Sequence, residues 1–242
     1  MLGYVSWNRG FKSGAFNLTT PEGAALNPEK LDAYEIGVKS EFLDNRMRLN
    51  VAAFYYDYQN LQVSVSAGGG GQVFKNATAR NYGFDAGLDF AATDHLTLSV
   101  GVALLDAQYT NYPGATAYTG TGTAIPIANA DGRDLPNAPP FSGYVSANYA
   151  VPTSIGDIKA NVSLSYNDST YVVPYDVPVR PSYELLTASV EWRPQTGTYG
   201  ARVWGRNLTN SYYGLNIISN SSGWIGNYAA PRTYGVTLFA DF

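Results

Sequence analysis

Alternation of apolar and polar residues is the dominant pattern along this 242-residue chain. In the segment 158–166, every even position is apolar or aromatic, whereas Lys159, Asn161 and Ser163 occupy odd positions. A strand sends successive side chains to opposite faces, so this alternation predicts β-strands with one apolar face. No apolar stripe at helical spacing appears. The chain is therefore predicted to be all-β.

We predict ten strands, most of them longer than the roughly 5–6 residues usual in globular proteins. Their ranges are 2–9, 33–43, 46–64, 77–91, 95–109, 141–151, 157–172, 182–193, 198–208 and 232–242. Short connections, near 44–45, 92–94, 152–156 and 194–197, alternate with long ones, near 10–32, 65–76, 110–140, 173–181 and 209–231. Tight turns at one end and long loops at the other are typical of an outer-membrane β-barrel.

The C-terminal segment favours the same interpretation, because its apolar face continues to the last residue. Tyr234, Val236, Leu238 and Phe242 share one parity of this final strand. Termini of soluble domains usually fray in polar sequence. We expect these four side chains to form the signal by which the barrel-assembly machinery recognises the C-terminal strand.

The amino-acid composition narrows the classes of function that this chain can have. Charged residues make up only 14% of the chain, and tyrosine, which suits a membrane–water interface, occurs 20 times. The net charge of −4 argues against a nucleic-acid partner, and cysteine is absent. The single histidine, His95, lies in a predicted turn without a nucleophile nearby. We identify no catalytic, cofactor-binding or metal-binding residue and do not expect an enzyme.

The apolar parity should face outer-membrane lipid, with aromatic residues at both ends of the strands. Examples are the pairs Tyr34 with Phe42 and Tyr82 with Phe90. The polar parity should then face a wet lumen. A soluble β-sandwich that binds carbohydrate would show the same alternation with inside and outside exchanged, so periodicity alone leaves this alternative open.

Six segments, in order along the chain, resemble the C-terminal part of TonB-dependent outer-membrane receptors. They are Tyr4–Asn17 (YVSWNRGFKSGAFN), Asn27–Lys39 (NPEKLDAYEIGVK), Asn45–Gln62, Asn76–Asp85 (NATARNYGFD), Gly205–Asn210 (GRNLTN) and Pro231–Leu238 (PRTYGVTL). Each motif is short, but the ordered series covers essentially the whole chain. Where the family motif has Glu, this sequence has Asp85.

The resemblance implies an antiparallel, up-and-down transmembrane β-barrel in the bacterial outer membrane. The family's barrels have about 22 strands around a plug. With ten predicted strands, residues 1–242 are expected to be the C-terminal part of such a barrel, either a partial barrel or a small closed one, without a plug domain. Met1 does not begin a signal peptide, so either the true start lies upstream or the outer-membrane interpretation is wrong. TonB would act only through the missing plug.

The implied function is uptake of a scarce, large nutrient such as a siderophore, cobalamin or glycan. A passive, porin-like barrel remains an alternative, and no residue identifies the small-molecule ligand. In the lumen, Glu35 and Lys39 are expected to pair beside Gly37. Arg202 and Arg206 could hold a plug carboxylate, although pairing with Glu191 on the neighbouring strand is preferred. At the mouth, the rings expected to offer stacking faces are Tyr112, Tyr118 and Trp224.

Overall fold

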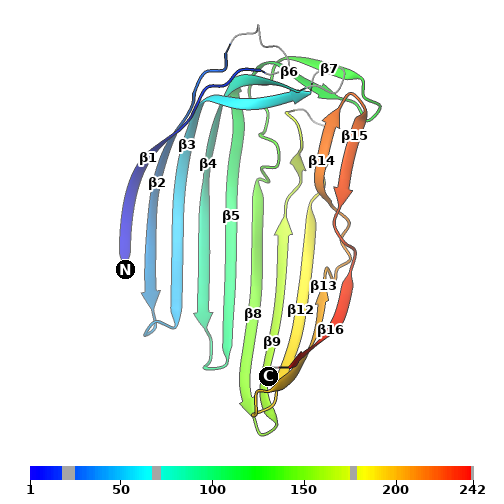
Figure 1. The fold of residues 1–242 in the computed structure, drawn as a ribbon. Coiled ribbons are helices and arrows are strands. Elements are labelled where there is room, and N and C mark those ends of the chain that lie inside the picture. Colours follow the sequence, from blue (N-terminus) through cyan, green and yellow to red (C-terminus); the bar gives the residue numbers. More distant parts are fainter. Residues whose placement is uncertain (18–24, 67–71, 175–178, 241–242) are drawn as a thin grey trace.

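The computed structural model describes residues 1–17, 25–66, 72–174 and 179–240, and its main feature is one antiparallel sheet of ten strands (Figure 1). The strands follow one another across the sheet in sequence order, as expected of an up-and-down barrel wall. They are β1 (Leu2–Lys12), β2 (Glu29–Phe42), β3 (Met47–Ser66), β4 (Gln72–Ala91), β5 (Leu96–Asn111), β8 (Phe141–Thr153), β9 (Gly156–Asn167), β12 (Tyr183–Arg193), β13 (Tyr199–Arg206) and β16 (Thr233–Ala240).

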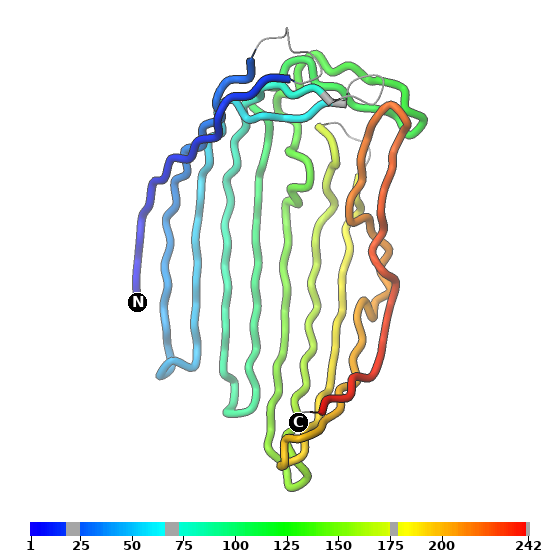
Figure 2. The backbone as a smooth tube through the Cα atoms, in the orientation of Figure 1, coloured from blue at the N-terminus to red at the C-terminus, as the bar shows by residue number. Residues whose placement is uncertain are grey.

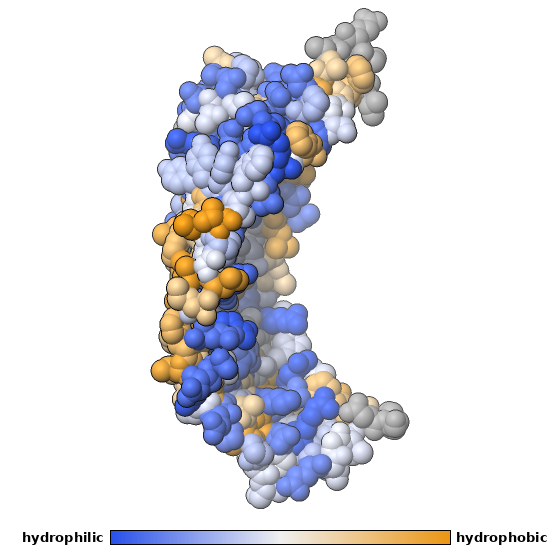
Figure 3. All heavy atoms as spheres, turned by 90° about the vertical axis from the view of Figure 1, so that its left-hand side faces the viewer, coloured by the Kyte–Doolittle hydropathy of each residue, from blue (hydrophilic) through white to orange (hydrophobic). Residues whose placement is uncertain are grey.

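The sheet is curved but open. β1 and β16 lie at its two edges, and the described residues make no ladder between them. Figures 2 and 3 show the resulting trough, with a concave and a convex side. The partial barrel among our expectations is therefore found, and the small closed barrel is not. The three other sheets among the described residues have only two strands each, so none of them forms the second layer of a β-sandwich. None of the described residues belongs to a helix long and apolar enough to cross a membrane.

The predicted strands and loop alternation are confirmed, with boundaries that shift by a few residues. Short turns lie at the lower end in Figure 1 and long connections at the upper end. The segment predicted as one strand over 157–172 is divided: β9 ends at Asn167, and β10 (Thr170–Tyr171) pairs with β11 (Val179–Arg180). The side chain of Asp168 accepts a hydrogen bond from the Ser169 amide at 2.8 Å, a local turn contact that competes with the ladder.

Register places an aromatic row on the convex face. Trp7, Tyr34, Tyr55 and Tyr82 are directly opposite one another on β1 to β4. Figure 3 shows hydrophobic residues gathered on this convex side. Because Trp and Tyr favour the membrane–water interface, this row marks the upper limit of the lipid-facing belt. Phe42, opposite Met47 and then Phe90, lies at the lower end of the same face.

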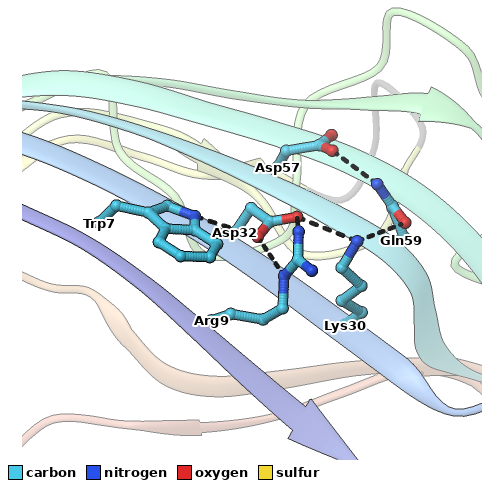
Figure 4. Close-up of polar contacts among 6 residues, drawn as sticks. All are labelled: Trp7, Arg9, Lys30, Asp32, Asp57 and Gln59. Atoms are coloured by element: carbon cyan, nitrogen blue, oxygen red, sulfur yellow. Dashed lines mark hydrogen bonds and ion pairs between the residues drawn. The ribbon is translucent and has the colours of Figure 1, made fainter.

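A charged row lies two residues above the aromatic row, with Arg9, Asp32, Asp57 and Arg80 directly opposite one another. Asp32 is buried beneath its partners. It accepts hydrogen bonds from Arg9 Nε at 2.6 Å and Trp7 Nε1 at 3.3 Å (Figure 4). The change from rings to ion pairs across one step of the ladder fixes the vertical position of the wall in the membrane.

The longest connections are not simple loops, and here the sequence prediction was wrong. The connection 110–140 contains a hairpin of β6 (Pro113–Tyr118) and β7 (Ala124–Asn129), and 209–231 contains one of β14 (Gly214–Asn220) and β15 (Gly223–Tyr228). The first hairpin packs on the upper ends of β3 and β4. The buried cluster that joins them is Val65, Ala77, Ala79, Tyr109, Tyr112, Ala115 and Ala130.

Aromatic rings on the concave face lie over glycines of the neighbouring strand. The directly opposed pairs are Tyr4 with Gly37, Phe54 with Gly83, Tyr144 with Gly101, and Trp204 with Gly235. In each pair, a Cβ atom on the glycine would collide with the ring. The wall thus carries large rings without widening, because the residue beneath each ring has no side chain.

Two glycines of β4 on this face allow a matched test. A Cβ at Gly83 would meet the Leu104 carbonyl oxygen and come within 2.6 Å of the Phe54 ring, whereas a Cβ at Gly87 has nothing within 4 Å. We expect Gly83→Ala to destabilise the folded protein by about 1–3 kcal/mol through overpacking. Gly87→Ala should be neutral or slightly stabilising. Urea unfolding in detergent micelles measures both, and equal midpoints would contradict the proposed ring–glycine packing.

Candidate functional site

The concave wall near β1 and β2 carries a three-residue contact centred on Tyr4. The Tyr4 hydroxyl donates a hydrogen bond to Glu35 Oε1 at 2.5 Å, and Lys39 Nζ lies 5.6 Å from the Tyr4 ring centroid. The expected ion pair between Glu35 and Lys39 does not form. The tyrosine ring, which occupies the space above Gly37, connects the acid and the base instead. The sequence analysis predicted that Gly37 leaves space on this face, but it did not predict that the Tyr4 ring fills that space.

On the opposite part of the wall, Glu191 of β12 is shared by two arginines. Arg193 Nε lies 3.0 Å from Glu191 Oε1, and Arg202 Nη1 lies 4.0 Å from Oε2. The preferred pairing of Arg202 with Glu191 is therefore present, but it is the longer of the two. Phe239 of β16 is an aromatic residue on the polar face. The guanidinium carbons of Arg193 and Arg202 lie 4.6 and 5.5 Å from its ring centroid, and these contacts account for its position there.

Arg206 does not pair with Glu191, contrary to expectation. Its guanidinium carbon lies 5.4 Å from the Trp204 ring centroid. Trp204 is held in turn by Gly235 beneath it and by a hydrogen bond from its Nε1 to Thr237 Oγ1 at 3.1 Å. The alternation of the strand correctly predicted that Arg202 and Arg206 share one face. It did not predict the contact of Arg206 with Trp204, two residues away.

A hollow of about 470 Å³ opens on the concave face of β4, β5, β8 and β9. Gly87, Gly101 and Ala103 form its floor, and Asp85 and Tyr144 stand at its border. Sequence analysis did not identify this hollow. The signal available was the coincidence of small residues on three neighbouring strands, which is visible only once the register is known.

At the mouth, the two long-connection hairpins contact each other. Trp224 Nε1 of β15 donates a hydrogen bond to the Tyr118 carbonyl oxygen of β6 at 2.7 Å, and Ser219 Oγ donates to the same oxygen at 3.2 Å. A Cβ on Gly223 would collide with the Gly120 carbonyl. This hairpin clasp, made by residues 118–122 and 219–224, spans from the β5 side of the mouth to the β13 side (Figure 1).

Two of the three predicted stacking rings are buried, which corrects the expectation for them. Tyr112 and Tyr118 are 3% and 5% exposed, so neither offers an open face, whereas Trp224 is 41% exposed. Burial raises the pKa of Tyr112 to about 12. Burial and the neighbouring Tyr112 also raise the pKa of Tyr109. The apolar bodies of these tyrosines serve packing in the loop cluster, and only Trp224 remains a candidate for ligand stacking.

Three of the four residues expected to form the C-terminal signal are described, and their role stays a prediction. Tyr234, Val236 and Leu238 point outward from β16 and are 80%, 65% and 79% exposed, while Phe242 lies outside the described residues. Within the part of the chain that the structure describes, no three His, Asp or Glu side chains come together in a way that could hold a metal ion.

A continuous antiparallel wall of ten strands, with an apolar convex face and charged groups on its concave face, is typical of an outer-membrane β-barrel protein. The sequence pattern of the family described as "TonB dependent receptor-like, beta-barrel" matches residues 1–208. The chain belongs to this family, whose members are outer-membrane transport proteins and not enzymes.

Curated relatives carry more specific descriptions. The "Probable TonB-dependent siderophore receptor PiuA" of Acinetobacter baumannii is 28% identical over 168 residues, which is 69% of this chain and 21% of that protein. The "Metal-pseudopaline receptor CntO" of Pseudomonas aeruginosa is 34% identical over 92 residues, which is 38% of this chain and 13% of that protein.

Solved structures share the fold. The ferric yersiniabactin uptake receptor FyuA from Yersinia pestis superposes with a TM-score of 0.80 at 18% identity, over 99% of this chain and 35% of that one. The siderophore receptor PiuA from A. baumannii gives 0.69 at 22% identity, over 88% of this chain and 28% of that one. The matched parts thus cover only 13% to 35% of the length of these similar proteins.

Removing the indole donor should loosen the hairpin clasp. Trp224→Phe keeps a ring but loses the hydrogen bond to Tyr118, which is worth about 1 kcal/mol. We expect amide hydrogen exchange in β14 and β15 to accelerate about fivefold. Ile225→Val, at the exposed neighbouring position, is the control and should leave exchange unchanged. Unaltered protection in Trp224→Phe would show that the clasp does not depend on this bond.

Alkaline pH should open the loop cluster. Tyrosine in an unfolded chain ionises near pH 10, whereas Tyr112 in the folded cluster ionises near 12. The stabilisation is therefore fully present below pH 10 and is lost as pH rises toward 12. Limited proteolysis of the β6–β7 hairpin should accelerate across this range. Tyr112→Phe should weaken the pH dependence, and Tyr228→Phe, at an exposed site, should leave it intact.

Proposed function

We propose that this chain forms the C-terminal part of the barrel wall of a TonB-dependent receptor that imports a siderophore or a similar metal chelate. The observation that carries the proposal is a polar, ring-bearing concave wall in a chain whose curated relatives are described as siderophore and metal-pseudopaline receptors. Cobalamin and glycans were equally open from the sequence, and the descriptions of these relatives favour the chelate.

The concave face suits passage of a polar cargo beside a folded partner. Its surface combines charged groups, such as Glu35, Lys39 and Arg202, with rings held rigidly over glycines. Rings fixed in this way lose little conformational freedom on contact, which favours binding of flat or chelating ligands. Trp224 at the mouth adds one exposed ring next to the hairpin clasp.

Partners follow from this assignment. Energy coupling would run through TonB and a plug that is not among residues 1–242, so this chain would contribute the wall and mouth and not the coupling element. The outward row Tyr234, Val236 and Leu238 on the edge strand β16 would present itself to the barrel-assembly machinery, because that edge has unpaired backbone groups.

Loss of the encoding gene should abolish growth on one ferric siderophore while growth on soluble iron continues. The measurement is growth and labelled-iron uptake across hydroxamate and catecholate siderophores, with cobalamin and oligosaccharides as further cargoes. Uptake deficits confined to cobalamin or a glycan would contradict the proposed cargo. An indiscriminate loss of small-solute permeability would contradict a receptor altogether.

The mass of the natural polypeptide tests whether this chain is one segment of a larger receptor. An antibody against residues 209–231 should detect, in outer-membrane fractions, a band about three times the mass of this chain, given that the chain covers 35% of the FyuA chain. A band at the mass of 242 residues would refute the proposal that the chain is part of a larger barrel.

A further inference from the structure

The geometry points to an anion-binding site on the concave wall, formed by Arg202 and Arg206 of β13, that takes a carboxylate or phosphate group. Both arginines line one hollow of about 350 Å³. The remaining walls supply hydrogen-bonding groups from neighbouring strands, with Asn161, Thr187, Ser189 and Thr237 among them.

Among the described residues, cations outnumber carboxylates on this part of the wall. On β9, β12 and β13, the polar parity carries the cations Lys159, Arg193, Arg202 and Arg206 but only the carboxylates Asp157 and Glu191. The opposite part of the wall, on β2 to β4, carries Glu35, Glu41, Asp85 and Asp89 against Lys39 and Arg48. An occupant that matches both parts must present negative charge toward β13.

Glu191 does not neutralise the pair. Its carboxylate is closer to Arg193, at 3.0 Å, than to Arg202, at 4.0 Å. The Nε of Arg202 is buried and has no hydrogen-bond partner among the described residues. Among those same residues, no carboxylate lies within ion-pair distance of Arg206. Arg206 is exposed and Arg202 has one carboxylate at 4.0 Å, so neither charge is closely neutralised.

Aromatic rings hold both guanidinium groups in place. Arg202 lies over Phe239 and Arg206 over Trp204, at 5.5 and 5.4 Å from the ring centroids. A cation–π contact uses the face of the guanidinium group, which leaves its edge donors for an anion. In Arg202 these donors are the Nη groups, because its Nε is buried. Because these donors match carboxylate and phosphate oxygens in a planar fork, the site is organised before the anion arrives.

The anion can come from two sources: a free ligand that passes along the wall, or a carboxylate side chain of a polypeptide segment that lies against it. Both sources present the same kind of anionic group. The hollow would bind that group whether or not the receptor imports an iron chelate. An experiment that disproves the anion site therefore leaves the proposed function standing, and the reverse also holds.

The test uses the full chain folded in neutral detergent, with citrate and inorganic phosphate as probes. Trp204 lines the hollow, so anion binding should change its fluorescence, and Trp204→Phe identifies that component of the signal. Arg202→Gln and Arg206→Gln should each weaken probe binding about tenfold or more. Arg206→Lys, which keeps the charge but not the fork, should lose less than Arg206→Gln.

Arg48→Gln is the matched control, because Arg48 is on the same face but is already paired with Glu41 at 3.3 Å. It should bind the probes like the unaltered chain. Absence of probe binding to folded chain, or equal weakening in Arg48→Gln, would overturn the site. Circular dichroism of each variant establishes that the strands are intact before the comparison is made.

A second arm distinguishes the two sources by repeating the titration on the receptor isolated from outer membranes. If a free ligand is the natural anion, citrate should bind there as it binds the chain. If a carboxylate of the polypeptide fills the hollow, the probe should bind the chain only, and Arg206→Gln should make the receptor unfold at lower urea concentration. Both sources would be contradicted if the receptor failed to bind citrate and Arg206→Gln did not lower the urea concentration at which it unfolds.

Discussion

The backbone ladder is the constraint on which the rest of this structure depends. In lipid, each unpaired N–H or C=O group is costly, so a wall that crosses the membrane must pair its strands continuously. A slip of one residue would exchange the two faces of a strand. The rows of Trp7, Tyr34, Tyr55 and Tyr82, and of charged residues just above them, show that the register holds across four strands. Membrane depth follows from the same rows.

The two faces solve different packing problems. The convex face meets fluid lipid, so any apolar side chain of suitable size is acceptable there. The concave face meets no other layer in the structure, yet it carries large rings. Four of these rings lie over an opposing glycine, as with Tyr144 over Gly101. The glycines that appear to weaken the strands are therefore the positions that let the wall present rigid aromatic surfaces.

The sequence predicted the wall well because its pattern is local and repeated. Alternation gives the strands, turn length gives the orientation, and hairpin register gives neighbours such as Glu191 and Arg202. The loop hairpins were not predicted because their strands are only six or seven residues long. Their core joins Ala115 to Val65, about fifty residues earlier, by contacts that no local pattern encodes. The burial of Tyr112 has the same long-range origin.

Side-chain partners on the concave face were harder to foresee for a further reason. An outer-membrane wall meets the same solvent, lipid, at every position of its outer face, so a general rule applies to that face. The inner face has no such uniform surroundings, and its contacts depend on which side chains the register brings together. Arg202 lies over Phe239 of β16 and Arg206 over Trp204 of its own strand, and alternation alone predicts neither contact.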